Sequence, residues 1–216
     1  INSITVGKGA NSVAGNTVLG ENALDASVTG QNNVAIGKNA LTEGTSVHNS
    51  VAIGALAADV NTSGANFVAV GYGTLSANTT GSSNTALGVS ALAANTTAGN
   101  NTAVGDSALA LNTTASNNTA LGKHSLKSNT TGSNNVGIGS NTLDANTTAD
   151  SVTAVGYRSL TSNTTGTQNT ALGADSMYTN TTGGTNVAVG FMTMYSNTTG
   201  SSNTGLSGIT SKLNWS

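Results

Sequence analysis

Hydrophobic and polar positions repeat along this chain with a period of 17 residues. One unit begins with Asn-Thr-Ala-Leu-Gly at residues 84–88, continues through Ser-Ala-Leu at 90–92 and reaches Asn-Thr-Thr at 95–97. The glycine returns at every 17th position from Gly20 to Gly190, and an aliphatic residue always precedes it. Self-similarity at one interval is the signature of a repeat architecture, in which each unit stacks on the next.

The residues around each glycine predict the local structure of one unit. A Thr or Val, a small residue and an aliphatic residue alternate before the glycine, which predicts a short strand. Ser-Ala-Leu after the glycine predicts a second strand, and Asn-Thr-Thr-Gly predicts a turn. A helix is disfavoured because Thr, Asn and Gly dominate and no 3.6-residue spacing appears. We therefore expect an all-β, parallel β-solenoid (a β-roll) with 17-residue coils.

The expected divisions of the chain follow the spacing of its glycines. Gly7 stands only 13 residues before Gly20, so residues 1–15 are expected to form a shortened N-terminal coil or cap. Residues 16–206 form the repeat solenoid, and residues 207–216 are the C-terminal end of the repeat region. The first residues contain no initiator Met, which suggests part of a longer chain.

Two aliphatic positions per coil are expected to point inward. They are the residue before the glycine, such as Leu121, and the residue four places after it, such as Leu126. Replacing Leu121 by Asp should then destabilise the fold strongly, because a buried charge would lack a partner. The small strand residue, Ala120 in this coil, faces the opposite side, where another backbone can approach closely. We expect each chain to complete its thin core against copies of itself as a homotrimeric fibre, although a monomeric solenoid can use the same residues.

Composition narrows the classes of function. Only 6% of residues are charged, the net charge is −2, and Cys and Pro are absent. Six Lys and Arg spread over the chain form no basic patch for nucleic acid or an anionic membrane. No apolar run is long enough to insert into a membrane, and thiolate metal sites and disulfides are excluded.

Several segments carry a resemblance to known repeat families. "NNVAIGKNAL" at residues 32–41 and "NSVAIGALA" at 49–57 resemble the head repeats of trimeric bacterial autotransporter adhesins, which form left-handed parallel β-rolls as homotrimers. "NTTGSSNTALG" at 78–88 resembles the repeats of phage tail-fibre proteins, often found ahead of an endosialidase-type chaperone domain. The resemblance covers residues 11–206 and implies the repetitive body of a fibre.

The expected function is that of a structural and adhesive segment of a virion tail fibre. It would act as a spacer and contact a host cell-surface receptor or glycan, without catalysis and without a cofactor. The head of a bacterial trimeric autotransporter adhesin, at the bacterial cell surface, is one alternative. Ice binding is another, because regular solenoids with aligned threonines can present a lattice to ice. One such set of threonines lies in the turns: Thr79, Thr96, Thr113, Thr130, Thr147, Thr164, Thr181 and Thr198.

Aromatic residues are the candidate contact residues. They occupy positions that carry charges in other coils, which predicts exposed rings able to stack on sugar faces. Packing between coils is the alternative. Tyr72, Tyr157 and Phe191 follow the glycine, whereas Tyr178 and Tyr195 follow the second aliphatic position. Tyr178, Phe191 and Tyr195 lie in adjacent coils and form the predicted contact patch.

Other polar residues have structural interpretations. We expect the carboxylates and the two histidines, His48 and His124, to be solvated surface groups rather than catalytic or metal-binding ones. The carboxylates are Glu21, Asp25, Glu43, Asp59, Asp106, Asp144, Asp150 and Asp175. Asn61 and the asparagines of the Asn-Thr-Thr turns are formal glycosylation sequons. The stronger expectation is that their amides bond neighbouring coils and that the threonines bridge through their hydroxyls. The Asn-Thr-Thr turns start at Asn78, Asn95, Asn112, Asn129, Asn146, Asn163, Asn180 and Asn197.

Overall fold

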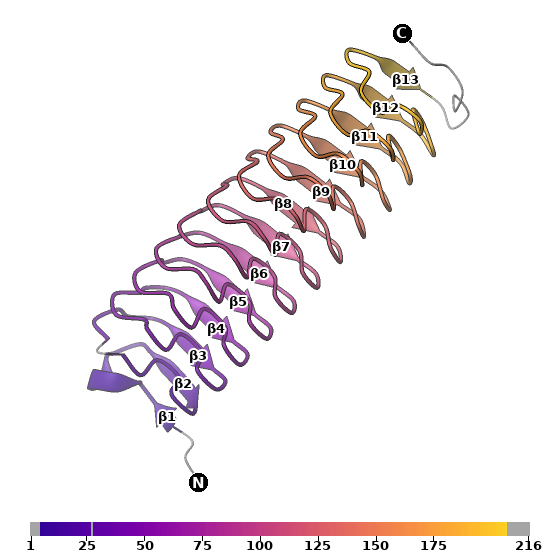
Figure 1. Ribbon diagram of the computed structural model, residues 1–216. Coiled ribbons are helices and arrows are strands. Elements are labelled where there is room, and N and C mark those ends of the chain that lie inside the picture. Colours follow the sequence, from indigo (N-terminus) through magenta and orange to yellow (C-terminus); the bar gives the residue numbers. More distant parts are fainter. Residues whose placement is uncertain (1–4, 27, 207–216) are drawn as a thin grey trace. The chain divides into compact units, whose positions relative to one another are not determined.

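The computed structural model describes residues 5–26 and 28–206, and the chain divides into two compact units, residues 1–107 and 108–216. Both units are built the same way, as stacked 17-residue coils that each contribute one short strand to a parallel sheet (Figure 1). The described residues contain no α-helix, and Ala10–Ser12 form a single 3₁₀ turn, η1. The predicted all-β parallel solenoid with 17-residue coils is confirmed.

The strands of each unit pair in sequence order. In residues 1–107 they are β1 (Thr5–Gly7), β2 (Thr17–Gly20), β3 (Val34–Ile36), β4 (Val51–Ile53), β5 (Val68–Val70), β6 (Thr85–Leu87) and β7 (Thr102–Val104). In residues 108–216 they are β8 (Thr119–Leu121), β9 (Val136–Ile138), β10 (Thr153–Val155), β11 (Thr170–Leu172), β12 (Val187–Val189) and β13 (Thr204–Leu206). From β2 onward the paired residues in each unit are 17 apart, for example Val34 with Val51. Strand β1 is the exception, because it pairs antiparallel with β2.

The predicted second strand of each coil does not form. The Ser-Ala-Leu segment is a turn in which Ser90 and Leu92 have φ angles of 55° and 52°. A strand requires negative φ at both positions, so this left-handed backbone excludes it. Backbone hydrogen bonds to the next coil hold the turn instead; Leu75 N–H, for example, donates to Ala91 O at 3.0 Å.

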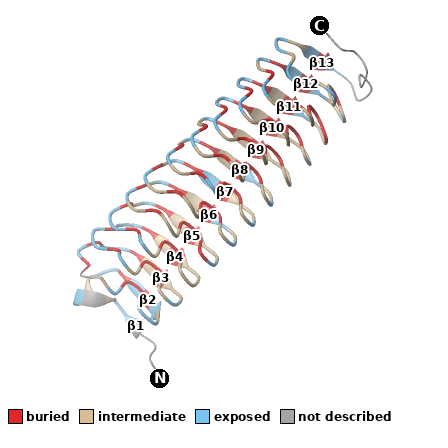
Figure 2. Cartoon of the chain, viewed as in Figure 1, coloured by how far each residue is buried: buried red, intermediate tan, exposed pale blue. Residues whose placement is uncertain are grey.

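The predicted inner and outer faces of the strand are reversed. Ala120, expected to face outward, is fully buried, whereas Leu121 is 46% exposed. The same alternation holds in the other coils, so the residues before the glycine do not form the core (Figure 2). The second aliphatic position behaves as expected: Leu126 is fully buried, and so are its equivalents from Leu24 to Met177. The inward assignment of Leu121 is therefore wrong, and the reason for expecting Leu121→Asp to destabilise the fold no longer holds.

The reversal has a steric cause. A 17-residue coil encloses little space, and the inner leucine, the two asparagines and small residues such as Ala91 and Ala98 already occupy it. At Gly137, which takes the alanine position, an added Cβ would meet Ser125 Oγ at 2.6 Å and the Leu126 side chain at 3.4 Å. From β3 onward the strands carry only alanine or glycine at this position, and β2 carries Val18, so the larger third residue of each strand faces outward.

Buried asparagine side chains occupy much of the interior of each coil. The asparagine that begins each Asn-Thr-Thr turn donates its amide to the equivalent asparagine of the preceding coil and to a carbonyl three residues ahead. Asn146 Nδ2, for example, lies 2.8 Å from Asn129 Oδ1 and 3.3 Å from Ala149 O. We call this set of equivalent residues the turn asparagine ladder. Buried polar groups are costly unless they are bonded, and here both ends of the amide are used.

A second set of asparagines lies just before the strand. Asn135 Oδ1 accepts the backbone N–H of Val152 at 2.9 Å, and Asn135 Nδ2 donates to Ala149 O at 2.8 Å. Asn118 makes the corresponding bonds to Asn135 and Gly132. These bonds join each coil to the next at the point where the strand begins.

The repeated glycine is required by backbone geometry. Gly122 has a φ of 131°, and an added Cβ would lie 2.5 Å from Gly139 O of the next coil. A side chain at this position would meet backbone rather than a mobile group, and only glycine readily adopts this φ. The strict spacing of the glycines follows from this contact.

Candidate functional site

The outward face of each sheet carries two exposed or half-buried sets of side chains. Thr or Val begins each strand from β2 onward, and Leu, Ile or Val is its third residue. Leu87 is 40% exposed and Leu121 is 46% exposed. Sheets made of parallel strands normally have both faces covered, and an uncovered apolar surface commonly marks an interaction site. This face, which we call the outer sheet face, is one candidate functional surface.

The five predicted contact aromatics are all accessible to solvent, but to different degrees. Tyr72 and Phe191 are each 57% exposed, and Tyr157 is 50% exposed. Tyr178 and Tyr195 are only half-buried. The first three share the position after the glycine, and the other two share the position after the inner leucine or methionine.

Tyr178 and Tyr195 lie side by side because they occupy the same position in successive coils. Their ring centroids are 5.1 Å apart and their planes differ by 6°. The Arg158 guanidinium lies 5.0 Å from the centroid of Tyr178 and 4.9 Å from that of Tyr157. Phe191, the third member of the predicted patch, has no ring contact with either tyrosine among the described residues. The faces of this stack are thus largely occupied by protein groups.

Arg158 and Asp175 complete the cluster and were not predicted as site residues. Arg158 Nε donates to Asp175 Oδ1 at 2.8 Å, and this hydrogen bond raises the pKa of Arg158. Asp175 is only 8% exposed, so the expectation of a solvated carboxylate is wrong for this residue. The signal was present in the sequence, since residues 17 apart lie in adjacent coils and 158 and 175 differ by 17.

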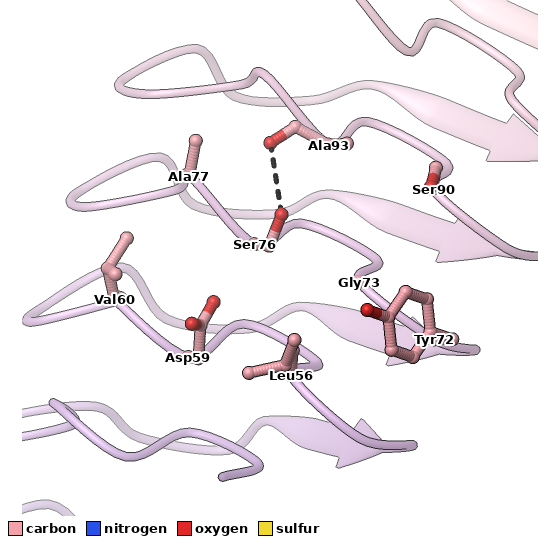
Figure 3. A pocket seen from close by; sticks show the side chains of 9 residues that line it. All are labelled: Leu56, Asp59, Val60, Tyr72, Gly73, Ser76, Ala77, Ser90 and Ala93. Atoms are coloured by element: carbon pink, nitrogen blue, oxygen red, sulfur yellow. Dashed lines mark hydrogen bonds between the residues drawn. The ribbon is translucent and has the colours of Figure 1, made fainter.

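A shallow, open depression lies beside Tyr72 in the N-terminal unit. Figure 3 shows the Tyr72 ring on one side and the Asp59 carboxylate on the other, with Leu56 between them. Small residues, including Gly73 and Ser76, supply the rest of the lining. An aromatic ring, a carboxylate and hydroxyl groups around one hollow are the elements of a small-ligand site.

Asp59 is unusual among the carboxylates. Its Oδ1 is buried and has no hydrogen-bond partner among the described residues. Burial raises the pKa of Asp59, and the nearby negative charge of Glu43 adds to the rise. Asp144 also has a buried Oδ1 without a partner in the described part of the chain.

Most of the remaining polar residues lie where they were expected. Glu21 is exposed and forms an ion pair with Lys38 Nζ at 3.1 Å. His48 is exposed and its Nδ1 accepts the backbone N–H of Gln31, whereas His124 is half-buried. The described residues place no three His, Cys, Asp or Glu side chains together as a metal-binding set.

The Asn-Thr-Thr sequons are built into the interior. Asn61, Asn78 and their equivalents as far as Asn180 are fully buried, so the folded chain offers their amides to no glycosyl donor. The threonines bond differently from the expectation, because most of their hydroxyls, from Thr62 to Thr181, donate to a carbonyl of the next coil rather than to another hydroxyl. Thr79 Oγ1, for example, donates to Thr96 O at 3.1 Å.

No helix among the described residues has the length and apolar character that a membrane crossing requires. Comparison with known proteins gives no family model, no curated protein and no solved structure that matches the chain.

Proposed function

We propose that the chain is the repetitive body of a homotrimeric fibre, part of a virion tail fibre, which spaces and presents a host-binding surface. The observation that carries this proposal is the outer sheet face. From β2 onward it is, in each unit, a parallel sheet whose outward side chains are Thr, Val, Leu and Ile. Because parallel sheets are normally covered on both faces, this one calls for a partner.

A second and a third copy of the chain fit that requirement best. Identical sheets repeat at the same 17-residue interval, so each strand of one copy finds the same side chains at the same height on the others. Closed assemblies of identical chains are the commonest way to cover such a surface. Three sheets facing one axis would bury Leu121 and Ile138 of every copy. The contact therefore lies on the larger strand residues, not on the alanines from which the trimer was first inferred.

The interior of the coil also suits a passive fibre. Its stability comes from many equivalent bonds between neighbouring coils, and the number of coils determines how much surface it presents. We propose no catalytic role for it. Weak contacts with a host receptor or glycan would add through the three chains of a fibre.

The head of a bacterial autotransporter adhesin is the alternative that shares all of this physics. Ice binding is a further alternative. The set of turn threonines suggested for it is less suited to binding ice, because their hydroxyls already make hydrogen bonds within the chain. Thr79 and Thr130 both donate their hydroxyls to carbonyls of the next coil.

Sedimentation of the purified chain tests the proposal directly. We expect a trimer at micromolar concentration, and a stable folded monomer would contradict it. The gene around this segment separates the two fibre classes: a chaperone domain downstream supports the tail fibre, whereas a coiled-coil stalk followed by a membrane anchor supports the adhesin. A thermal-hysteresis measurement on the same sample tests ice binding.

A further inference from the structure

The depression beside Tyr72 has a counterpart of the same design in the C-terminal unit. Asp59, Tyr72 and Gly73 stand 85 residues, or five periods, before Asp144, Tyr157 and Arg158. The carboxylate and the tyrosine are therefore the same in both places. The residue after the tyrosine is the one of these three that differs.

The residue after the tyrosine, with the neighbours that hold it, determines whether the tyrosine face is open: Arg158 is bonded to Asp175, and the counterpart of Asp175 beside Tyr72 is Ser90. In the C-terminal unit the Arg158 guanidinium lies 4.9 Å from the centre of the Tyr157 ring and covers it. In the N-terminal unit Gly73 has no side chain, and an added Cβ there would meet only Ser90 Oγ, at 4.0 Å. Among the described residues, no cation or second ring lies over Tyr72.

The polar groups around the open ring are hydrogen-bond acceptors and hydroxyls. Asp59 lines the hollow with a half-buried side chain, and because its Oδ1 is buried, a ligand meets only the rest of the carboxylate. The Ser76 hydroxyl donates to Ala93 O at 3.5 Å and keeps its lone pairs, and Ser90 faces the same hollow (Figure 3). A ligand that suits this set carries hydroxyl donors on its rim and an apolar face that can lie on a ring.

We propose that the Tyr72 depression binds one neutral pyranose ring of a glycan. The C–H face of the sugar lies on the uncovered Tyr72 ring, and its hydroxyls donate to Ser76, to Ser90 and to the part of the Asp59 carboxylate that lines the depression. Acidic sugars are disfavoured because Asp59 and Glu43 are both negative and close enough to interact. This inference rests on the proposed host-contact function and names its ligand class.

The site is open, so its affinity for a single sugar is low. One ring and one carboxylate predict a Kd of about 1–10 mM for a monosaccharide. A trimeric fibre would present three such sites, and avidity would raise the apparent affinity for a polysaccharide.

The test uses saturation-transfer NMR on the full chain with four probes: the methyl pyranosides of glucose, galactose, mannose and N-acetylglucosamine. We expect transfer to the ring protons of at least one probe, concentrated on one face of the sugar. Tyr72→Ala should abolish it. Gly73→Arg combined with Ser90→Asp should abolish it as well, because the pair reproduces Arg158 and Asp175 beside the tyrosine, at a position that tolerates arginine at a φ near 53°. Asp59→Asn should weaken it about tenfold or more.

Two matched variants serve as controls. Phe191→Ala removes an equally exposed ring at the same position of another coil, and Asp144→Asn removes the equivalent carboxylate beside the covered tyrosine. Both should leave transfer unchanged. The proposal is overturned if no probe receives transfer, or if transfer survives Tyr72→Ala or the Gly73→Arg, Ser90→Asp double variant. Sedimentation of the same samples keeps the two proposals apart, since a trimer without sugar binding leaves the fibre proposal standing.

Discussion

The side-chain amide of Asn146 donates to the Oδ1 of Asn129 at 2.8 Å, and Asn129 in turn donates to Asn112 Oδ1 at 2.9 Å. Equivalent residues of successive coils are thus bonded directly, through side chains that are fully buried. The turn asparagine ladder replaces the large apolar core that this composition cannot supply, and it ties the stability of each coil to that of its neighbours.

Removing one member of the ladder should therefore be costly. Asn129→Ala deletes three hydrogen bonds: those to Asn112 and Gly132, and the one that it accepts from Asn146. We expect a loss of about 2–4 kcal/mol and a fall in melting temperature of about 5–15 °C. Thermal denaturation followed by circular dichroism measures it. Thr148→Ala, in the next exposed turn, is the control and should change little.

Leu126 is the inner leucine of its coil and is fully buried. Leu126→Ala should lower the free energy of unfolding by about 2–5 kcal/mol, because it removes the apolar contacts and leaves a cavity. Leu111→Ala is the matched control, since that leucine is 50% exposed and lies outside the strand. A loss of similar size in both variants, measured by chemical denaturation, would contradict the assigned interior.

Leu121→Asp separates folding from assembly. Leu121 is 46% exposed in the single chain, so the substitution should leave the coil intact. In the proposed trimer it would bring three carboxylates together on a covered face, and we expect assembly to weaken by at least about 100-fold. Sedimentation across a concentration series measures the change, with Thr148→Asp as the control for added charge. A trimer that withstands Leu121→Asp would place the interface elsewhere.

Two glycines with positive φ should respond very differently to alanine. Gly122→Ala forces a Cβ to within 2.5 Å of Gly139 O at a φ of 131°, so we expect a loss of at least about 3 kcal/mol or failure to fold. Gly73→Ala places its Cβ in open space at a φ of 60°, and its cost should be no more than about 1 kcal/mol. Expression level and melting temperature distinguish the two. Equal losses of stability in Gly122→Ala and Gly73→Ala would contradict the close contact between Gly122 and Gly139.

Asp59 gives the chain a pH dependence of defined sign. Burial raises its pKa above the ordinary 3.8, so the folded state binds this proton more tightly than the unfolded state does. The stabilisation is complete below pH 3.8 and is lost as the pH rises through the higher folded value. Asp59→Asn should therefore melt about 1–2 °C above the wild type at neutral pH and lose that advantage in acid. Asp25→Asn, an exposed carboxylate at the same position of another coil, should show no such difference. A wild type that melts above Asp59→Asn at neutral pH would reverse the assigned sign.

The coil length, the parallel stacking and the buried leucine were predictable because they depend only on the period. The direction in which the strand faces was not. Alternation of Thr119, Ala120 and Leu121 separates two faces but does not say which one is inside, and hydrophobicity favoured Leu121. The answer depends on how little room Leu126 and the asparagines leave, which is a property of the closed coil.

The prediction of a second strand in each coil was wrong for a related reason. Propensity scales assume the common backbone regions, whereas Leu92 takes a left-handed φ that leucine seldom adopts alone. In the candidate site, the 17-residue separation of Tyr178 and Tyr195 predicted that they are neighbours, and in the structure their rings are stacked. The sequence did not show that Tyr157 is covered and Tyr72 is open. This became visible only in the structure, where Arg158 and Gly73 occupy the equivalent position of two coils.

Strand β1 runs against the direction of the strand that it pairs with, and this has a consequence for growth. A stack of self-similar coils is open to polymerisation, because its terminal edge presents the same donors and acceptors that each new coil uses. In the N-terminal unit β1 occupies the edge of β2, from Thr5 opposite Gly20 to Gly7 opposite Val18, so a further coil cannot add to β2 in the parallel register that joins the other coils.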